Sequence, residues 1–121
     1  MPVLTKRVYE PAVPEDGHRL LVMRFWPRGV RKERVDSWQR DLAPSRDLLA
    51  DFRSGAIDWA AYAERFHGEM ASQPVSIEAL RDARRVAAVG LLTLLCWCHD
   101  ETRCHRTLLR DLITAQETAT P

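Results

Sequence analysis

The sequence predicts a small α/β domain in which helices pack against a sheet that is at least partly parallel. Three observations support this class: three short segments have the composition of strands, four segments have helical patterning, and their chain order is β-β-α-α-α-β-α. Strands separated by helices are typical of parallel sheets. The 121 residues have the length of one domain. We expect its core over about residues 3–115 and a flexible tail over residues 116–121.

The first two strands are predicted from short segments that end at turn residues. Residues 3–9, "VLTKRVY", have strand-like composition, and the loop "EPAVPEDGH" follows them. Residues 19–25, "RLLVMRF", indicate a buried strand, which Pro27 and Gly29 close. Residues 35–42, "VDSWQRDL", have a mixed pattern, which we interpret as one or two helical turns.

Three central helices are each predicted from a capping residue followed by an apolar stripe. Ser45 precedes the short stripe of "RDLLADF". Asp58 precedes "WAAYAERFHGEM", whose apolar residues follow the i, i+3, i+4, i+7, i+11 spacing of one helix face. Ser76 precedes "IEALRDARRVAA", and Gly90 ends that helix.

The C-terminal part is predicted to form the last strand and the last helix. Residues 91–97, "LLTLLCW", are the clearest strand, and the helix runs from about Thr102 to Ala115. Parallel sheets bind ligands beyond the carboxyl ends of their strands. Two loops follow strands here, "WPRG" at 26–29 and "CHDETRCHR" at 98–106. We expect the two loops to converge if their strands are parallel neighbours.

Composition narrows the classes of function. The net charge of +1 excludes a strong basic field over the whole molecule. The odd number of cysteines, three, argues against a disulfide framework and fits reduced thiols in the cytoplasm. Residues 1–20 contain no long apolar core of a signal peptide, and the apolar run 86–98 is too short to span a membrane. We therefore expect a soluble cytoplasmic protein without a membrane partner.

All three cysteines and two of the four histidines lie within residues 96–105. Cys96 and Cys98 would point the same way on an extended strand, and Cys104 with His99 or His105 would complete four zinc ligands. The spacing matches none of the usual C-x-x-C knuckles, however. Neighbouring helical residues also diverge by about 100°. We therefore predict no metal and no cofactor, and a zinc-binding structural domain is kept as an alternative.

A reactive thiol is a second interpretation of the cluster. Cys104 would lie in the first turn of the last helix, where the helix dipole favours a thiolate. His105 is a candidate general acid or base, because its unperturbed pKa lies near neutrality. The alternative without chemistry is that Cys104 packs in the core, because Cys104, Leu108 and Leu112 form an i, i+4, i+8 row. Cys96 ends an apolar strand and is expected in the core, and Cys98 is expected to be the most exposed thiol.

An anion site is the third interpretation. The first turn of a helix presents unpaired N–H groups that bind phosphate or carboxylate. Arg103 and Arg106 flank that turn, and Arg28 could approach it from the other loop, with Trp26 as a wall. Arginine binds planar oxyanions through a bidentate fork. The alternative is that these arginines are solvated or pair with the nearby Asp and Glu residues.

The stretch "KRVYEPAVPEDGHRLLVMRFWPRGVRKERVDSWQRDLAPSRDL" resembles the YeaO-like branch of the domain of unknown function 488. The shared features are an R-x-Y start, a D-G-x-R-x-L-V strand, a W-P-R-G loop and a W-x(3–5)-P-S segment. The resemblance extends over residues 6–113 and implies a small α/β fold with no established activity. It also implies a functional site that joins the two loops, with these members: Arg24, Trp26, Pro27, Arg28, Gly29, Cys96, Cys104, His105 and Arg106.

The chain departs from that branch at several positions. Many members carry Asp where this chain has Met23, and many carry Tyr at Cys96 and Asn-His-Ala at residues 104–106. The Cys-His-Arg triplet instead resembles the broader family. Some members carry a uroporphyrin methyltransferase label, but this chain has no Gly-rich cofactor loop to support it.

The combined prediction is a cleft between the W-P-R-G loop and the start of the last helix that binds a small anionic ligand bearing phosphate or carboxylate. His105 and Cys104 are the candidate catalytic residues, and the sequence leaves open whether a chemical step follows binding. The alternative from another class is a non-catalytic module that binds nucleic acid or protein through "RGVRKER". Nucleic acid is the less favoured partner, and its binding would weaken steeply with salt.

Overall fold

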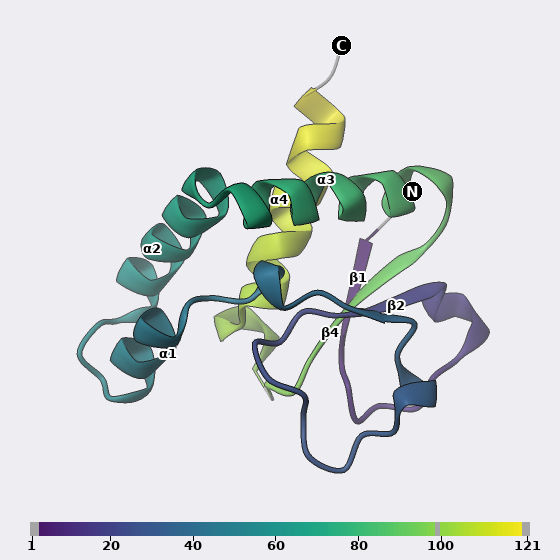
Figure 1. The fold of residues 1–121 in the computed structure, drawn as a ribbon, viewed down its shortest axis with the longest axis horizontal. Coiled ribbons are helices and arrows are strands. Elements are labelled where there is room, and N and C mark those ends of the chain that lie inside the picture. The colour runs from purple at the N-terminus through teal and green to yellow at the C-terminus, as the bar shows by residue number, and fades with distance from the viewer. Residues whose placement is uncertain (1–2, 99, 120–121) are drawn as a thin grey trace.

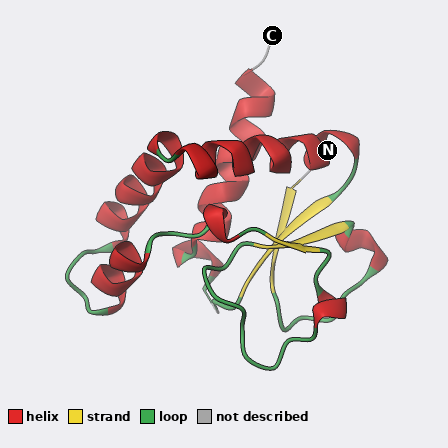
Figure 2. Cartoon of the chain, viewed as in Figure 1, coloured by secondary structure: helices red, strands yellow, loops and turns green. Residues whose placement is uncertain are grey.

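The computed structural model describes residues 3–98 and 100–119. It contains a four-stranded sheet in the order β1-β4-β2-β3, and all of its strand pairs are parallel. The strands are β1 (Val3–Arg7), β2 (His18–Leu21), β3 (Ser37–Trp38) and β4 (Leu92–Cys96). Helices pack against this sheet, as Figures 1 and 2 show. The predicted α/β class is therefore confirmed.

The central strand β4 supplies the core on both faces of the sheet. Its five residues are all buried between β1 and β2. Leu92 and Leu94 pack in the large cluster formed with the helices, whereas Leu95 packs with Val8 and Leu21 in a smaller cluster. Successive side chains on a strand point to opposite faces, which explains this division.

Four helices contribute to the large cluster: α1 (Arg46–Arg53), α2 (Trp59–Ser72), α3 (Pro74–Val89) and α4 (His105–Ala119). The smaller cluster is covered instead by side chains from the loop between β2 and β3 and by Trp38. The sheet thus has a helical face and a face covered by loops. Within the described residues, no helix is long and apolar enough to cross a membrane.

The prediction of helical turns over residues 35–42 is wrong in part. Ser37 and Trp38 form β3, paired with Leu20 and Leu21, and a 3-10 turn follows only at Arg40–Leu42. The Trp38 indole Nε1 donates to the carbonyl of Met23 at 2.7 Å. This tertiary contact and the pairing with β2 fix an extended conformation that the local pattern does not specify.

Two helices begin at positions other than those predicted. α3 begins at Pro74, and Ser76 lies within it, donating its hydroxyl to the carbonyl of Asp41 at 2.7 Å. α4 begins at His105 rather than near Thr102, because Asp100 caps a separate 3-10 turn over residues 101–103. α4 also continues to Ala119, and residues 120–121 of the predicted tail lie outside the described residues.

Candidate functional site

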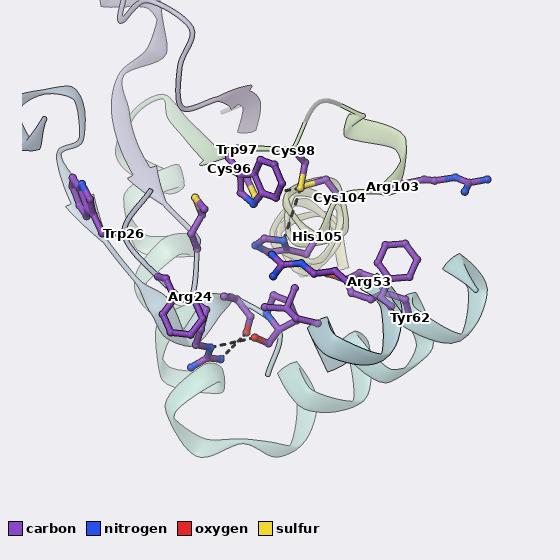
Figure 3. A pocket seen from close by; sticks show the side chains of 16 residues that line it. Arg24, Trp26, Arg53, Tyr62, Cys96, Trp97, Cys98, Arg103, Cys104 and His105 are labelled. Carbon is purple, nitrogen blue, oxygen red and sulfur yellow. Dashed lines mark hydrogen bonds between the residues drawn. The ribbon is translucent and has the colours of Figure 1, made fainter. Parts of the chain in front are cut away.

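A cavity of about 440 Å³ opens at the carboxyl ends of β2 and β4 (Figure 3). Its walls come from residues 23–26 after β2, residues 96–98 and 103–105 around the start of α4, and side chains of α1 and α2. Since β2 and β4 are parallel neighbours, the segments that follow them meet here, although only Trp26 of the W-P-R-G loop lines the cavity.

The predicted site residues divide into two groups. Six line the cavity: Arg24, Trp26, Cys96, Arg103, Cys104 and His105. Pro27, Arg28, Gly29 and Arg106 do not line it. Pro27 is buried, and Arg28 and Gly29 are exposed. The W-P-R-G loop is a turn, in which the Trp26 indole Nε1 donates to the carbonyl of Val30 at 2.8 Å.

Arg106 has a structural contact in place of the predicted ligand contact. Its side chain is buried, and its Nη1 donates to the carbonyl of Cys98 at 2.9 Å. The Arg106 Nε is buried and has no hydrogen-bond partner among residues 3–98 and 100–119. This hydrogen bond holds the positive charge of Arg106 against the backbone of Cys98, in the segment that follows β4.

Of the residues that the structure describes, three arginines and no Asp or Glu line the cavity. The Arg24 guanidinium is fixed by the carbonyls of Ala43 and Pro44, at 3.0 and 3.2 Å. Arg53, from the last turn of α1, points into the cavity, whereas Arg103 extends outward from its rim (Figure 3). Neither of these two side chains forms a hydrogen bond or ion pair with any residue of 3–98 or 100–119. Sequence reasoning missed Arg53, because no local signal places the end of α1 beside β2.

The three thiols gather at the inner wall of the cavity. Cys96 and Cys104 are buried and Cys98 is half-buried. The Sγ atoms of Cys96 and Cys98 lie 3.7 Å apart, and Cys104 Sγ lies 3.9 Å from Nδ1 of His105. Cys104 precedes α4 with extended backbone (φ −132°, ψ 140°), so its side chain turns toward the same region as that of His105. His99, the other histidine of the cluster, lies outside the described residues.

The hydrogen bond of His105 sets its tautomer. Nε2 lies 2.5 Å from the carbonyl oxygen of Val22, and a carbonyl can only accept, so Nε2 carries a proton. Burial lowers the pKa of His105, although the bond to Val22 opposes this. The imidazole is therefore neutral near pH 7, and Nδ1 presents a free lone pair toward the thiols.

The three thiols titrate together. Hydrogen bonds from Cys104 and Cys96 lower the pKa of Cys98, and the positive charge of Arg106 adds to this. Hydrogen bonds to its two neighbours and burial raise the pKa of Cys104. A hydrogen bond with Cys104 lowers the pKa of Cys96, but the bond to Cys98 and burial outweigh it, so that pKa is also raised. Cys98, which sequence reasoning left out of the site, is thus the thiol of the cluster whose pKa is lowered.

A parallel α/β domain with a ligand-sized cavity at the carboxyl edge of its sheet is the class that the fold and site define. The chain matches the family model described as the active DUF488-N3 subclade, DUF488-N3a, over residues 3–117, and it belongs to that family. The resemblance seen in the sequence is thereby confirmed.

Similar proteins include the uncharacterized protein YeaO of Escherichia coli K12, which is 35% identical over 113 residues, 92% of this chain and 96% of that protein. The uncharacterized protein Rv3073c of Mycobacterium tuberculosis H37Rv is 31% identical over 116 residues, 94% of this chain and 95% of that protein. No solved structure is significantly similar to the chain.

Proposed function

We propose that the cavity binds a small anionic ligand with a flat apolar part, and that a phosphate or carboxylate group of this ligand faces Arg53. The observation that carries the proposal is the charge of the lining, to which the described residues contribute three guanidinium groups and no carboxylate. An unbalanced group of arginines in a partly enclosed site favours an oxyanion, which arginine holds by paired hydrogen bonds.

The size and the walls of the cavity favour a ligand that has an apolar part. About 440 Å³ lies in the range of small-molecule sites, roughly 300–1,000 Å³. Trp26, Phe52 and Tyr62 contribute aromatic surface, and the rings of Phe52 and Tyr62 pack with centroids 4.5 Å apart. Aromatic walls favour a planar group that stacks or meets them edge-on. A nucleoside monophosphate combines both features.

The arginines have different roles in this proposal. Arg53 contacts the anionic group, and Arg103 at the rim attracts it. Arg24 supplies a positioned charge, because two backbone carbonyls hold its guanidinium. Arg28 and Arg106, which the sequence favours as anion ligands, do not line the cavity and have no part in the proposal.

The proposal is for binding and includes no chemical step. The pKa of Cys104 is raised by hydrogen bonds to the other thiols, and that of His105 is lowered by burial. Both directions keep the two groups neutral near pH 7, so they do not form a thiolate–imidazolium pair. Catalysis by Cys104 and His105 stays a prediction from the sequence.

Tryptophan fluorescence provides the test, because Trp26 and Trp97 line the cavity. Adenosine 5′-monophosphate is the probe, and adenosine is its neutral analogue. We expect the monophosphate to bind at least about tenfold more tightly, since one charge-assisted hydrogen bond contributes roughly 1.5–3 kcal/mol. Arg53→Gln should remove most of this preference. Equal binding of the two probes, or failure of both to bind, would overturn the proposal.

Two control variants separate the cavity from other basic surfaces. Arg85→Gln removes an exposed arginine of α3 that pairs with Asp82 at 2.7 Å, and it should leave binding unchanged. Arg31→Gln removes a charge from the exposed loop that the alternative module would use. Binding that depends on Arg31 rather than Arg53, and that weakens steeply with salt, would favour the alternative module.

A further inference from the structure

We propose that Cys96, Cys98, Cys104 and His105 form a tetrahedral site for a thiophilic divalent metal ion, best matched by Zn²⁺. The site goes beyond the anion-binding function and lies on the inner wall of the same cavity. Three sulfur atoms and one imidazole nitrogen are a ligand set that zinc prefers.

The spacing of the donor atoms fits one ion. With Zn–S near 2.3 Å and Zn–N near 2.0–2.1 Å, a tetrahedron has edges of about 3.8 Å between sulfurs and about 3.6 Å between sulfur and nitrogen. The Cys96 and Cys98 sulfurs lie 3.7 Å apart, and Cys104 Sγ lies 3.9 Å from His105 Nδ1. The ligand atoms of Cys96, Cys104 and His105 all lie within 4.8 Å of one another. Cys98 Sγ lies outside this compact group of three, so a movement of the Cys98 side chain would complete the coordination.

The hydrogen bond of His105 prepares Nδ1 as the ligand atom. Its Nε2–H donates to the carbonyl of Val22, which fixes the tautomer and the ring orientation. Metal-binding histidines usually donate their other ring N–H to a carbonyl or carboxylate in this manner. The lone pair on Nδ1 faces the thiols rather than solvent, because the side chain is buried.

The geometric objection raised by the sequence does not apply in the fold. It assumed that Cys104 and His105 both lie on a helix and diverge by about 100°. Cys104 instead has extended backbone before the first residue of α4, and both side chains reach the cluster. Cys96 and Cys98, two residues apart at the end of β4, present their sulfurs on the same side.

The charge of the surroundings suits a thiolate-rich site. Three thiolates and one divalent ion leave a single negative charge. The guanidinium of Arg106 is buried next to the cluster, where its Nη1 donates to the carbonyl of Cys98, and its Nε has no partner in the described part of the chain. A buried cation with an unused N–H favours neighbouring thiolates.

The test uses Co²⁺ as a spectroscopic probe on the full chain, stripped with a chelator and kept reduced without oxygen. We expect one equivalent of Co²⁺ to produce thiolate-to-cobalt charge-transfer bands and the intense visible bands of tetrahedral cobalt. One equivalent of Zn²⁺ should then bleach both sets of bands. Absence of these bands from the wild-type chain, or bands typical of octahedral cobalt, would overturn the proposal without any variant.

Variants identify the ligands. Cys104→Ser and His105→Gln should each weaken the charge-transfer intensity and the affinity for Co²⁺ at least tenfold, whereas His67→Gln, at an exposed histidine of α2, should change neither. Unchanged spectra in both ligand variants would refute the assignment. Nucleotide binding by the metal-free chain is measured separately, so a negative result for one proposal leaves the other proposal standing.

Discussion

Asp16 forms the most buried ion pairs of the described structure, and its replacement by Asn tests how much they stabilise the fold. Its carboxylate accepts from Lys6 Nζ at 3.1 Å, from Arg19 Nη1 at 2.5 Å and from the backbone N–H of Val13 at 3.2 Å. The side chains of Asp16 and Arg19 are only 3% and 6% exposed. Because Lys6 belongs to β1 and Arg19 to β2, the carboxylate joins two strands that do not pair directly.

Asp16→Asn keeps the shape and one acceptor oxygen but removes the charge. The Arg19 guanidinium then stays buried without a counterion, and breaking a buried pair in this way costs about 3 kcal/mol. A chain of this length has an unfolding entropy near 0.25 kcal/mol/K, so the expected drop in Tm is about 12 °C. The control is Asp82→Asn, which breaks a pair with Arg85 whose side chains are 56% and 70% exposed. That change should cost less than about 1 kcal/mol.

The pH dependence gives the same reasoning a second test. Burial alone would raise the pKa of Asp16, but the hydrogen bonds from Val13, Lys6 and Arg19 lower it below the ordinary value of 3.8. A lowered folded-state pKa adds stability that is fully present above 3.8 and is lost as the pH falls through the folded-state value. Urea denaturation should therefore show that the difference in the free energy of unfolding between wild type and Asp16→Asn becomes smaller in acid. The reasoning fails if Asp16→Asn costs no more than Asp82→Asn at neutral pH, or if the difference is unchanged near pH 3.

Two further substitutions test local geometry by urea denaturation. Gly17→Ala should cost well over the roughly 1–2 kcal/mol of a positive φ, because the residue has φ +63° and a Cβ would lie 2.4 Å from the carbonyl oxygen of Leu91. Gly29→Ala, at φ +81° with open space around it, should lose only the stability that a positive φ costs. Equal losses in the free energy of unfolding for the two variants would contradict this account. Ser45→Ala should cost about 1–2 kcal/mol, because the hydroxyl caps α1 and donates to Glu69 Oε2 at 2.5 Å. A loss below a few tenths of a kcal/mol would show that this contact is not stabilising.

The helices and the central strand could be predicted because their signals are local. Ser45 and Asp58 both cap their helices as the sequence indicates, accepting from the backbone N–H groups of Leu48 and Ala61. β4 has five consecutive buried residues, which a continuous apolar run predicts. β3 could not be predicted, since two residues carry no periodicity and their extended conformation comes from pairing with β2.

The sequence predicts where the candidate site lies better than it predicts which residues line the site. The rule that ligands bind at the carboxyl edge of parallel strands is enough to bring the two loops together. It does not identify which arginine turns inward. Arg28 lies in a loop whose tight turn leaves its side chain exposed, and Arg53 reaches the cavity only because α1 packs beside it. Tertiary packing, rather than any local pattern, therefore decides which charged side chains line the cavity.

The start of α4 is the local feature on which both proposals depend. Asp100 accepts from the N–H of Thr102 at 3.0 Å and so begins a separate short 3-10 turn, Glu101–Arg103, before the helix. A helix that began at Thr102 would carry Cys104 and His105 on adjacent positions about 100° apart, and only one of them could face the other thiols. Starting at His105, α4 leaves Cys104 extended toward the cluster, turns Arg106 inward against Cys98, and leaves Arg103 at the cavity rim. The delay of about one turn thus places the proposed metal ligands and the proposed anion contact at Arg103 on different sides of one short segment.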